Sequence, residues 1–261
     1  MSTDVTISDS DGVRVITLDR PQSKNGLTDE VNAEIIAGLE GATTDAAIRC
    51  VVLTGKNGNF CSGLDLKAAA ANAGGFENAE HHLRTYFHGM IRAVRAVPKP
   101  VVALVDGPAV GYGCDLALAC DLRVGTERTR FGEVFVKRGL MPDGGGTFTL
   151  PRLVGVAKAL ELMFLGDMVE ADDAVRLGLV NYRVASVEAE AFTANLARRL
   201  AAGPPLVQAA VKHAVYAALE GTLDSALENE VQNQVRLLRS KDFFEGISAF
   251  FQKRPPAFTG E

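Results

Sequence analysis

Short apolar runs alternate with amphipathic stretches along the first 125 residues of the chain. Stretches with helical spacing of apolar positions occur at Thr28 to Gly41 and at Asn78 to Val97. The apolar runs are short and β-branched, and they predict strands at Val5 to Ser8, Val13 to Leu18, Cys50 to Thr54, Val101 to Val105 and Leu122 to Gly125. This alternation predicts an α/β fold.

Local signals predict where the two helices begin and end. Thr28 precedes the acidic Asp29, which is the pattern of a capped helix start, and Gly41 is expected to end that helix. Pro98 and Pro100 are expected to end the second helix before the next strand begins.

Beyond Pro151 the pattern becomes mostly helical and rich in Ala and Leu. Helices are predicted at Val154 to Leu165, Ala171 to Leu177, Val187 to Ala202, Pro205 to Leu219, Leu223 to Leu238 and Phe243 to Phe251. Several of them are apolar on more than one face, so they could pack against a partner subunit.

Composition and charge exclude several classes of protein. The 261 residues are 47% hydrophobic and 23% charged, which is ordinary for a globular protein and excludes disorder. The 27 basic and 32 acidic residues give a net charge of −5, so nucleic acid and anionic membranes are poor partners. The start of the chain has no leader pattern and no apolar run is long enough to span a membrane, so we expect a cytoplasmic protein.

The four cysteines do not form a recognisable metal motif. Cys50, Cys61, Cys114 and Cys120 include no C-x-x-C pair and have no histidine at ligand spacing. We therefore expect no metal site and interpret the four residues as buried, reduced thiols.

Two glycine-bearing junctions each follow a strand-like run and lead into a helix-like one. They are Asn59 to Lys67 and Asp106 to Asp115. Glycine lets a backbone approach a ligand closely, and a helix start offers free N–H groups, so the two junctions could hold one oxygen between two amides. Two tight turns without a ligand are the alternative. Neither junction has the full dinucleotide-binding or P-loop pattern.

An ordered set of segments resembles the crotonase superfamily of acyl-CoA enzymes, which includes enoyl-CoA hydratases and isomerases. The matching segments are Leu18 to Pro21, Val51 to Gly55, Phe60 to Lys67, Lys99 to Ala103, Gly111 to Arg123, Pro142 to Thr147 and Ala249 to Arg254. Each piece alone is modest, but the ordered set is specific.

The resemblance implies a fold and an assembly. It implies a spiral of strand-strand-helix turns over residues 1–203 with the acyl-CoA site, then a C-terminal helical trimerisation region over residues 204–261. The assembly would be a homotrimer or a dimer of trimers. Coenzyme A would be part of the substrate, with no other cofactor and no metal.

The resemblance also implies an oxyanion hole. The backbone N–H groups of Leu64 and Tyr112 would hold the thioester oxygen, and a helix beginning near Gly113 would add its positive end. Negative charge develops on that oxygen when a neighbouring proton is removed, and each preorganised donor contributes roughly 2.7 to 4 kcal/mol to its stabilisation.

The acid/base residues of the family match this chain only in part. Asp115 lies at the position of one hydratase glutamate, whereas Phe135 replaces the second and cannot transfer protons. Asp143 matches an acid of some double-bond isomerases. The pattern favours isomerisation over hydration, because one carboxylate can shuttle a proton between two carbons. Phe135 would line the pocket and raise the pKa of a nearby carboxyl.

Other interpretations of these residues remain open. Asp115 would also suit the first turn of a helix and Asp143 a turn or helix cap. We interpret Glu133 as a solvated or hydrogen-bonded neighbour. His88 lies on a helix-like stretch that could reach the site, although an ordinary core or surface histidine is the favoured interpretation. The function alternatives are an enoyl-CoA hydratase, an acyl-CoA hydrolase, and a non-catalytic acyl-CoA-binding or RNA-binding homologue, although the acidic balance disfavours RNA.

Coenzyme A carries phosphates, so an acidic protein that binds it needs local cations. Lys24 and Lys67, together with Arg20, flank the segments that contact the nucleotide in the family. Lys253 and Arg254 match a C-terminal pair that reaches the coenzyme A of a neighbouring subunit. Solvated surface charge is the alternative for each.

Overall fold

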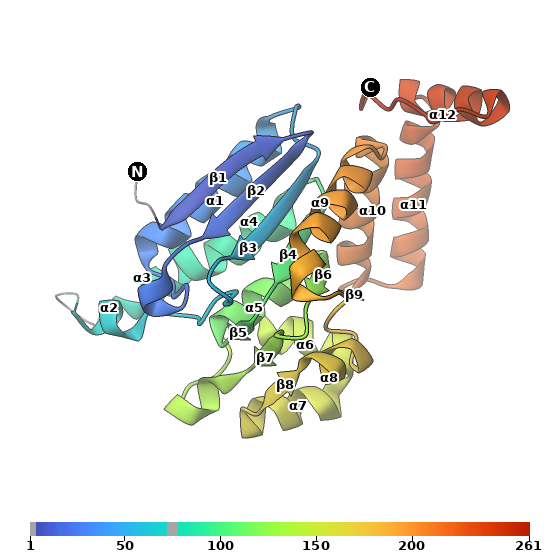
Figure 1. The fold of residues 1–261 in the computed structure, drawn as a ribbon. Helices are drawn as coiled ribbons and strands as arrows, with labels where there is room; N and C mark the ends of the chain where they lie inside the picture. Colours follow the sequence, from blue (N-terminus) through green and yellow to red (C-terminus); the bar gives the residue numbers. More distant parts are fainter. Residues whose placement is uncertain (1–3, 72–77) are drawn as a thin grey trace.

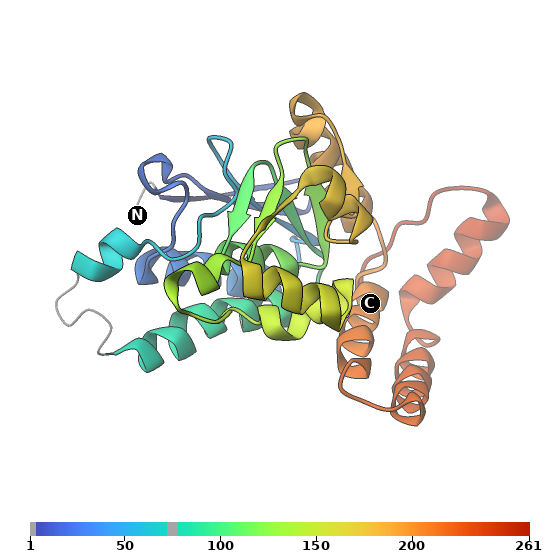
Figure 2. The same cartoon turned by 90° about the horizontal axis from the view of Figure 1, so that it is seen from below.

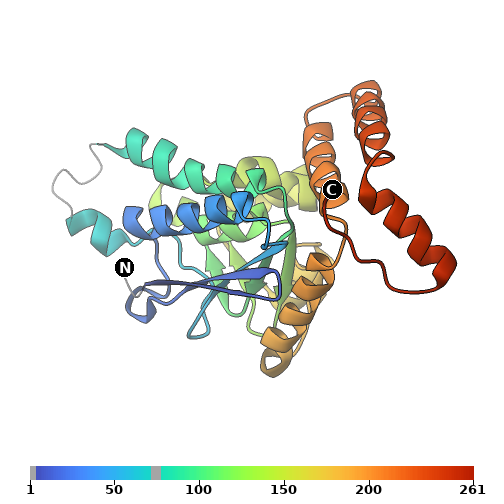
Figure 3. The same cartoon turned by 90° about the horizontal axis from the view of Figure 1, so that it is seen from above.

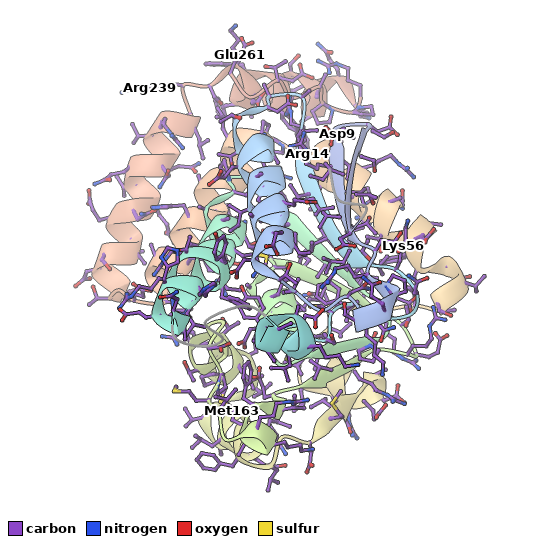
Figure 4. All side chains as sticks on the ribbon, turned by 90° about the vertical axis from the view of Figure 1, so that its left-hand side faces the viewer. Asp9, Arg14, Lys56, Met163, Arg239 and Glu261 are labelled. Carbon is purple, nitrogen blue, oxygen red and sulfur yellow. The ribbon has the colours of Figure 1, made fainter. Side chains whose placement is uncertain are left out.

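A six-stranded sheet forms the centre of the molecule (Figure 1). The computed structural model describes residues 4–71 and 78–261. The strands lie in the order β1 (Val5–Ser10), β2 (Val13–Leu18), β3 (Cys50–Gly55), β4 (Val101–Val105), β6 (Leu122–Gly125) and β9 (Tyr182–Arg183). Only the β1–β2 hairpin pairs in antiparallel fashion among these strands, and Arg14 forms an ion pair with Asp9 across it (Figure 4).

Both faces of this sheet are covered by helices, which explains why its central strands are continuously apolar. On β3, Val51 and Leu53 belong to the main core together with helices α1 (Asp29–Thr44) and α4 (His88–Ala96). Cys50 and Val52 point to the opposite face, where α9 (Ala189–Ala201) packs (Figure 3). The period of two along the strand therefore divides its side chains between two cores.

The first predicted helix begins as expected but runs past its predicted end. The Thr28 side chain accepts a hydrogen bond from the Val31 N–H. The helix continues through Gly41 to Thr44, so the prediction that Gly41 ends it was wrong. Gly41 leaves room for a neighbouring side chain instead, since a Cβ there would lie 2.9 Å from an Arg14 guanidinium nitrogen.

The second predicted helix is three consecutive pieces. They are α3 (Ala79–His82), a π-helical turn (Leu83–Phe87) and α4. Such a turn widens a helix locally and is often found at functional sites. Here the carbonyl of its last residue, Phe87, accepts a hydrogen bond of 2.6 Å from the Tyr112 hydroxyl.

A second sheet of three short strands was not predicted. It consists of β5 (Pro108–Val110), β7 (Arg130–Gly132) and β8 (Met168–Glu170), in that order. Three residues carry too little periodicity to be identified, and long-range pairing with other segments holds each strand in place.

The remaining helices surround the two sheets and continue into the C-terminal part of the chain. They are α2 (Leu66–Ala71), α5 (Tyr112–Ala119), α6 (Gly146–Val154), α7 (Val156–Leu165), α8 (Ala171–Arg176), α10 (Pro205–Ala218), α11 (Leu223–Leu237) and α12 (Lys241–Gln252). Short 3-10 turns lie at Pro21–Ser23, Val134–Arg138 and Ser186–Glu188. The expected boundary at residues 203 and 204 falls in the turn between α9 and α10.

The last two helices extend away from the rest of the chain (Figures 1 and 2). The helix before them, α10, is attached to the core by an ion pair of 2.8 Å between Lys212 and Asp121. α11 has no buried residue at all. Within residues 4–71 and 78–261, no helix combines the length and the apolar character that a membrane span requires.

Candidate active site

Four chain segments that are far apart in sequence lie side by side at the ends of β4 and β5. The Leu27 N–H donates to the Gly63 carbonyl at 2.8 Å, and the Val110 N–H donates to the Cys61 carbonyl at 2.9 Å. The Gly111 N–H donates to the Gly132 carbonyl at 2.7 Å. Backbone pairing therefore brings both glycine-bearing junctions of the sequence together with the segment that follows β7.

The backbone amides of Leu64 and Tyr112 are adjacent in this arrangement. Gly63, directly before Leu64, has φ +84°, and a Cβ added to it would lie 3.2 Å from the Tyr112 nitrogen and 2.8 Å from the Val110 carbonyl oxygen. Neither the Leu64 nor the Tyr112 N–H donates to a backbone or side-chain acceptor in the described part of the chain. Two backbone N–H groups without an acceptor, from separate segments of the chain, therefore lie next to each other.

The Tyr112 side chain fixes the start of the helix that carries the second amide. Its ring packs edge-on against Phe87, with 4.6 Å between the ring centroids, and its hydroxyl holds the Phe87 carbonyl. The ring also borders Gly144. The family resemblance assigns a role only to the backbone N–H of Tyr112. No pattern in the sequence predicted the contacts that the Tyr112 side chain makes.

Asp115 lies on the first turn of α5 and is 1% exposed. Its Oδ2 accepts a hydrogen bond of 2.8 Å from the Gly144 N–H, while its Oδ1 has no hydrogen-bond donor. A Cβ on Gly144 would lie 2.6 Å from the Asp115 Cβ, so only glycine allows this close contact. Burial and the neighbouring Glu133 and Asp143 hold the pKa of Asp115 well above its ordinary value.

Asp143 directly precedes the glycine that holds Asp115. Its Oδ1 is buried and has no hydrogen-bond partner in the structure. Burial raises the pKa of Asp143, and the nearby His88 imidazole on α4 opposes this shift. His88 therefore lies in the neighbourhood of the acids, which is the less favoured of its two interpretations from the sequence.

Glu133 is a third acid at the site, and because it is buried, the solvated one of its two interpretations was wrong. It follows β7 and is 3% exposed, with neither carboxylate oxygen paired to an N–H or a hydroxyl. Burial raises the pKa of Glu133 to about 7. No sequence pattern indicates this burial, because it results from the pairing of β7, a strand of only three residues.

Phe135 is buried on the 3-10 turn that follows Glu133. Its ring Cζ lies 3.8 Å from the point that a Cβ on Gly111 would occupy. The ring therefore forms an apolar wall beside the residue that precedes the Tyr112 amide.

Two of the predicted cations are exposed close to the first junction. The Lys24 carbonyl accepts a hydrogen bond of 3.1 Å from the Ser62 N–H, and Lys67 lies on α2, which begins two residues after Leu64. Both side chains are exposed. Arg20 is instead buried, and its guanidinium is engaged by Asp4 and Asp65, so it is not a free surface cation.

The C-terminal pair of cations lies on another part of the molecule. Lys253 and Arg254 follow α12, which is on the opposite side from α2 in two perpendicular views (Figures 1 and 3). Arg254 forms an ion pair with Glu245. Within one chain, Lys253 therefore does not join Lys24 and Lys67.

All four cysteines are buried and unpaired, as expected. Residues 4–71 and 78–261 contain no group of three or more His, Cys, Asp or Glu side chains arranged to hold a metal ion.

Comparison with known proteins identifies the family. Residues 8–261 match the family model described as enoyl-CoA hydratase/isomerase. The chain belongs to the enoyl-CoA hydratase/isomerase family. This enzyme is therefore an acyl-CoA enzyme of the crotonase type, and its mixed α/β fold matches crotonase-fold structures.

Relatives of this family member cover nearly its whole length. A Rhodobacter capsulatus protein named "Probable enoyl-CoA hydratase" is 41% identical over 96% of each chain. The 1,2-epoxyphenylacetyl-CoA isomerase of Escherichia coli is 37% identical, again over 96% of each chain. The crystal structure of an enoyl-CoA hydratase from Bacillus anthracis superposes with a TM-score of 0.95 at 31% identity, covering 99% of this chain and all of the other.

Proposed function

We propose that this enzyme moves the double bond of an enoyl-CoA thioester through an enolate held by the Leu64 and Tyr112 amides. Two observations support the oxyanion hole: the two N–H groups are free, and backbone packing at Gly63 makes them adjacent. Donors fixed by backbone pairing do not have to reorganise as charge develops on the thioester oxygen. α5 begins at Tyr112 and adds the positive end of its dipole.

Asp143 is the proton carrier in this proposal. As a carboxylate it takes a proton from the carbon next to the thioester of a 3-enoyl-CoA, and the electron pair moves onto the thioester oxygen. The enolate then collapses as the same carboxyl returns the proton to the distal carbon, which gives a 2-enoyl-CoA. Partial burial raises the pKa of Asp143 toward neutrality, which suits a group that must both accept and release a proton.

The choice of isomerisation rests on two residue types in the sequence: an acid at Asp143, and Phe135 at the position of the second hydratase glutamate. Hydration must both orient a water and deliver a proton, two tasks that are usually shared by two carboxylates. The Phe135 ring fills the position of the second hydratase glutamate and excludes water from the wall beside Gly111. Among the relatives, the Escherichia coli 1,2-epoxyphenylacetyl-CoA isomerase also bears the name of an isomerase.

Hydration of a trans-2-enoyl-CoA is the second candidate. The contact between Asp115 and Gly144 brings two carboxyls near the amides, and such a pair could replace the missing glutamate. Relatives named as hydratases, including the 2,3-dehydroadipyl-CoA hydratase of Escherichia coli at 34% identity, favour it. Hydrolysis of the thioester and non-catalytic binding are the remaining alternatives.

The proposal includes the way the substrate binds and the chains assemble. The coenzyme A phosphates are bound near the exposed Lys24 and Lys67, and Lys253 is contributed by a neighbouring subunit of a homotrimer or a dimer of trimers. Coenzyme A is part of the substrate, and the proton shuttle needs no other cofactor and no metal. We place the reaction in the cytoplasm.

The test is to follow the products formed from a 3-enoyl-CoA and from a trans-2-enoyl-CoA in water. The wild-type enzyme is expected to convert the 3-enoyl-CoA into the 2-enoyl-CoA faster than it hydrates the latter. Asp143→Asn is expected to lose about a hundredfold or more of the isomerase kcat, because an amide cannot take up the proton.

Asp172→Asn is the matched control, since its side chain is 82% exposed on another part of the chain. It is expected to keep full activity. An isomerase rate unchanged in Asp143→Asn would remove Asp143 from the mechanism. Release of free coenzyme A by the wild-type enzyme would favour hydrolysis instead.

A further inference from the structure

Glu133 is a buried acid for which the proposed proton shuttle has no use. Neither of its oxygens is paired with an N–H or a hydroxyl, although the residue is 3% exposed. Its polar neighbours are the Asp115 carboxyl and the Cys114 thiol, and Asp143 contributes a further negative charge. Asp167 lines a cavity of about one water molecule beside Glu133. Among the described residues, no arginine, lysine or histidine forms an ion pair with Glu133.

Asp115 has one oxygen in the same situation. Its Oδ2 is held by the Gly144 N–H, but its Oδ1 is buried with no donor. A Cβ on Gly146 would lie 2.2 Å from the Asp115 Oδ1 and 3.1 Å from the Glu133 Oε1. The unpaired oxygens of Asp115 and Glu133 therefore both lie beside Gly146, which has no side chain.

Two buried carboxylates this close cannot both be ionised, because each charge opposes the other and burial disfavours both charges. One proton shared by the two oxygens makes one carboxyl the donor and the other the acceptor of a hydrogen bond. Neither oxygen is then left unpaired. We propose that Asp115 and Glu133 share one proton at neutral pH, and that Glu133 is a positioning residue that keeps the Asp115 carboxyl hydrogen-bonded and limits its charge.

The shared proton has a consequence for the reaction, and this consequence rests on the proposed function. Asp115 lies one helical turn after the Tyr112 amide. A full negative charge there would oppose the charge that develops on the thioester oxygen. With the proton shared, the three acids carry two negative charges instead of three, and Asp143 remains free to act as the base.

The proton itself can be observed without any substrate. In the infrared spectrum of the full-length protein at neutral pH, we expect the carbonyl stretch of a protonated carboxylic acid. Asp115→Asn and Glu133→Gln are each expected to lose this band, because the new amide donates to the remaining carboxylate and lets it ionise. Glu170→Gln removes an exposed carboxylate on the neighbouring β8 and is expected to keep the band.

The pH dependence of turnover tests the role of the proton. We expect the kcat of the wild-type enzyme to fall as the pair loses its proton, by about tenfold per pH unit once it is ionised. In Glu133→Gln, Asp115 is already ionised at neutral pH, so kcat is expected to be low there and to show no further alkaline decline, while KM changes little. A merely structural role would lower kcat by the same factor at every pH and keep the alkaline decline.

The outcomes separate the two proposals. Absence of the infrared band in the wild-type protein, or its survival in both single variants, would overturn the shared proton. Presence of the band in a protein without enoyl-CoA turnover would leave the shared proton intact and overturn the proposed function. An alkaline decline retained in Glu133→Gln would overturn the positioning role.

Discussion

At the scale of single residues, Gly63 determines how closely the two proposed oxyanion donors approach each other. Its φ of +84° is unfavourable for any residue with a side chain. The space around it is also closed, since a Cβ would lie 2.8 Å from the Val110 carbonyl oxygen and 3.2 Å from the Tyr112 nitrogen. A side chain here would push the Leu64 segment away from Tyr112.

Gly63→Ala is therefore expected to lower both kcat and stability. The backbone strain costs about 1–3 kcal/mol of unfolding free energy. Displacement of a preorganised donor is expected to lower kcat about a hundredfold. Thermal unfolding and steady-state kinetics with a 3-enoyl-CoA measure the two effects.

Gly139→Ala is the matched control. Gly139 has φ +70° but open space around its Cα, so this variant is expected to show the strain without the loss of kcat. Equal kcat in the two variants would show that the position of the Leu64 amide does not limit the reaction.

The residue scale is also where the sequence was least informative. Asp115 and Asp143 were identifiable as candidate acids because they lie in motifs that resemble a known family. Glu133 was not, because nothing in its own segment reveals that β7 pairs with β5 and buries it. The electrostatic effect of His88 on Asp143 depends likewise on the packing of α4, which a single helix pattern does not specify.

At the scale of elements, strands with longer apolar runs were predicted from the sequence and the shortest strands were not. β2, β3 and β4 have five or six residues each and were predicted within a residue of their bounds. β5, β7 and β8 have three residues and are defined by their partners, so they had no signal of their own. The π-helical turn was also invisible, because it keeps the apolar spacing of the helix that contains it.

The C-terminal elements carry an apolar face that their own chain does not cover. On α11, residues about one helical turn apart are exposed: Leu223, Leu227, Val231, Val235 and Leu238. On α12, Phe244, Phe250 and Phe251 are exposed as well. Monomeric proteins seldom expose this much contiguous apolar surface, which supports burial against other copies of the chain.

Val231→Asp is expected to dissociate the assembly, because a buried, unpaired carboxylate at the interface is strongly unfavourable. Sedimentation equilibrium is expected to give the mass of three or six chains for the wild-type protein and a smaller mass for the variant. Gln232→Asp adds the same charge on another side of α11 and is expected to leave the mass unchanged. A wild-type protein that sediments as a single chain would contradict the proposed assembly.

At the scale of the whole molecule, the three buried acids couple stability to pH. Burial raises the pKa of Asp115, Glu133 and Asp143 above their values in the unfolded chain. The folded protein therefore binds more protons than the unfolded one between about pH 4 and 7. Their contribution is most favourable at low pH and is lost as pH rises through the folded pKa values.

We expect the contribution of the three acids to the free energy of unfolding to fall from about pH 5 through neutral pH, until the proton shared by Asp115 and Glu133 is lost. The pKa of Glu133 rises from 4.5 to about 7, which corresponds to roughly 3 kcal/mol of this change. Denaturant unfolding of the wild-type protein and of Glu133→Gln across this range measures it. If the free energy of unfolding fell as steeply with pH in Glu133→Gln as in the wild type, Glu133 would not contribute to this pH dependence.

A crystal structure with a bound acyl-CoA would show where the thioester oxygen binds. We expect this oxygen about 2.7–3.1 Å from both the Leu64 and the Tyr112 nitrogen, with the Asp143 carboxyl facing the neighbouring carbon. A thioester oxygen bound away from these two nitrogens, or either N–H donating to the protein's own carbonyl in that complex, would contradict the proposed oxyanion hole.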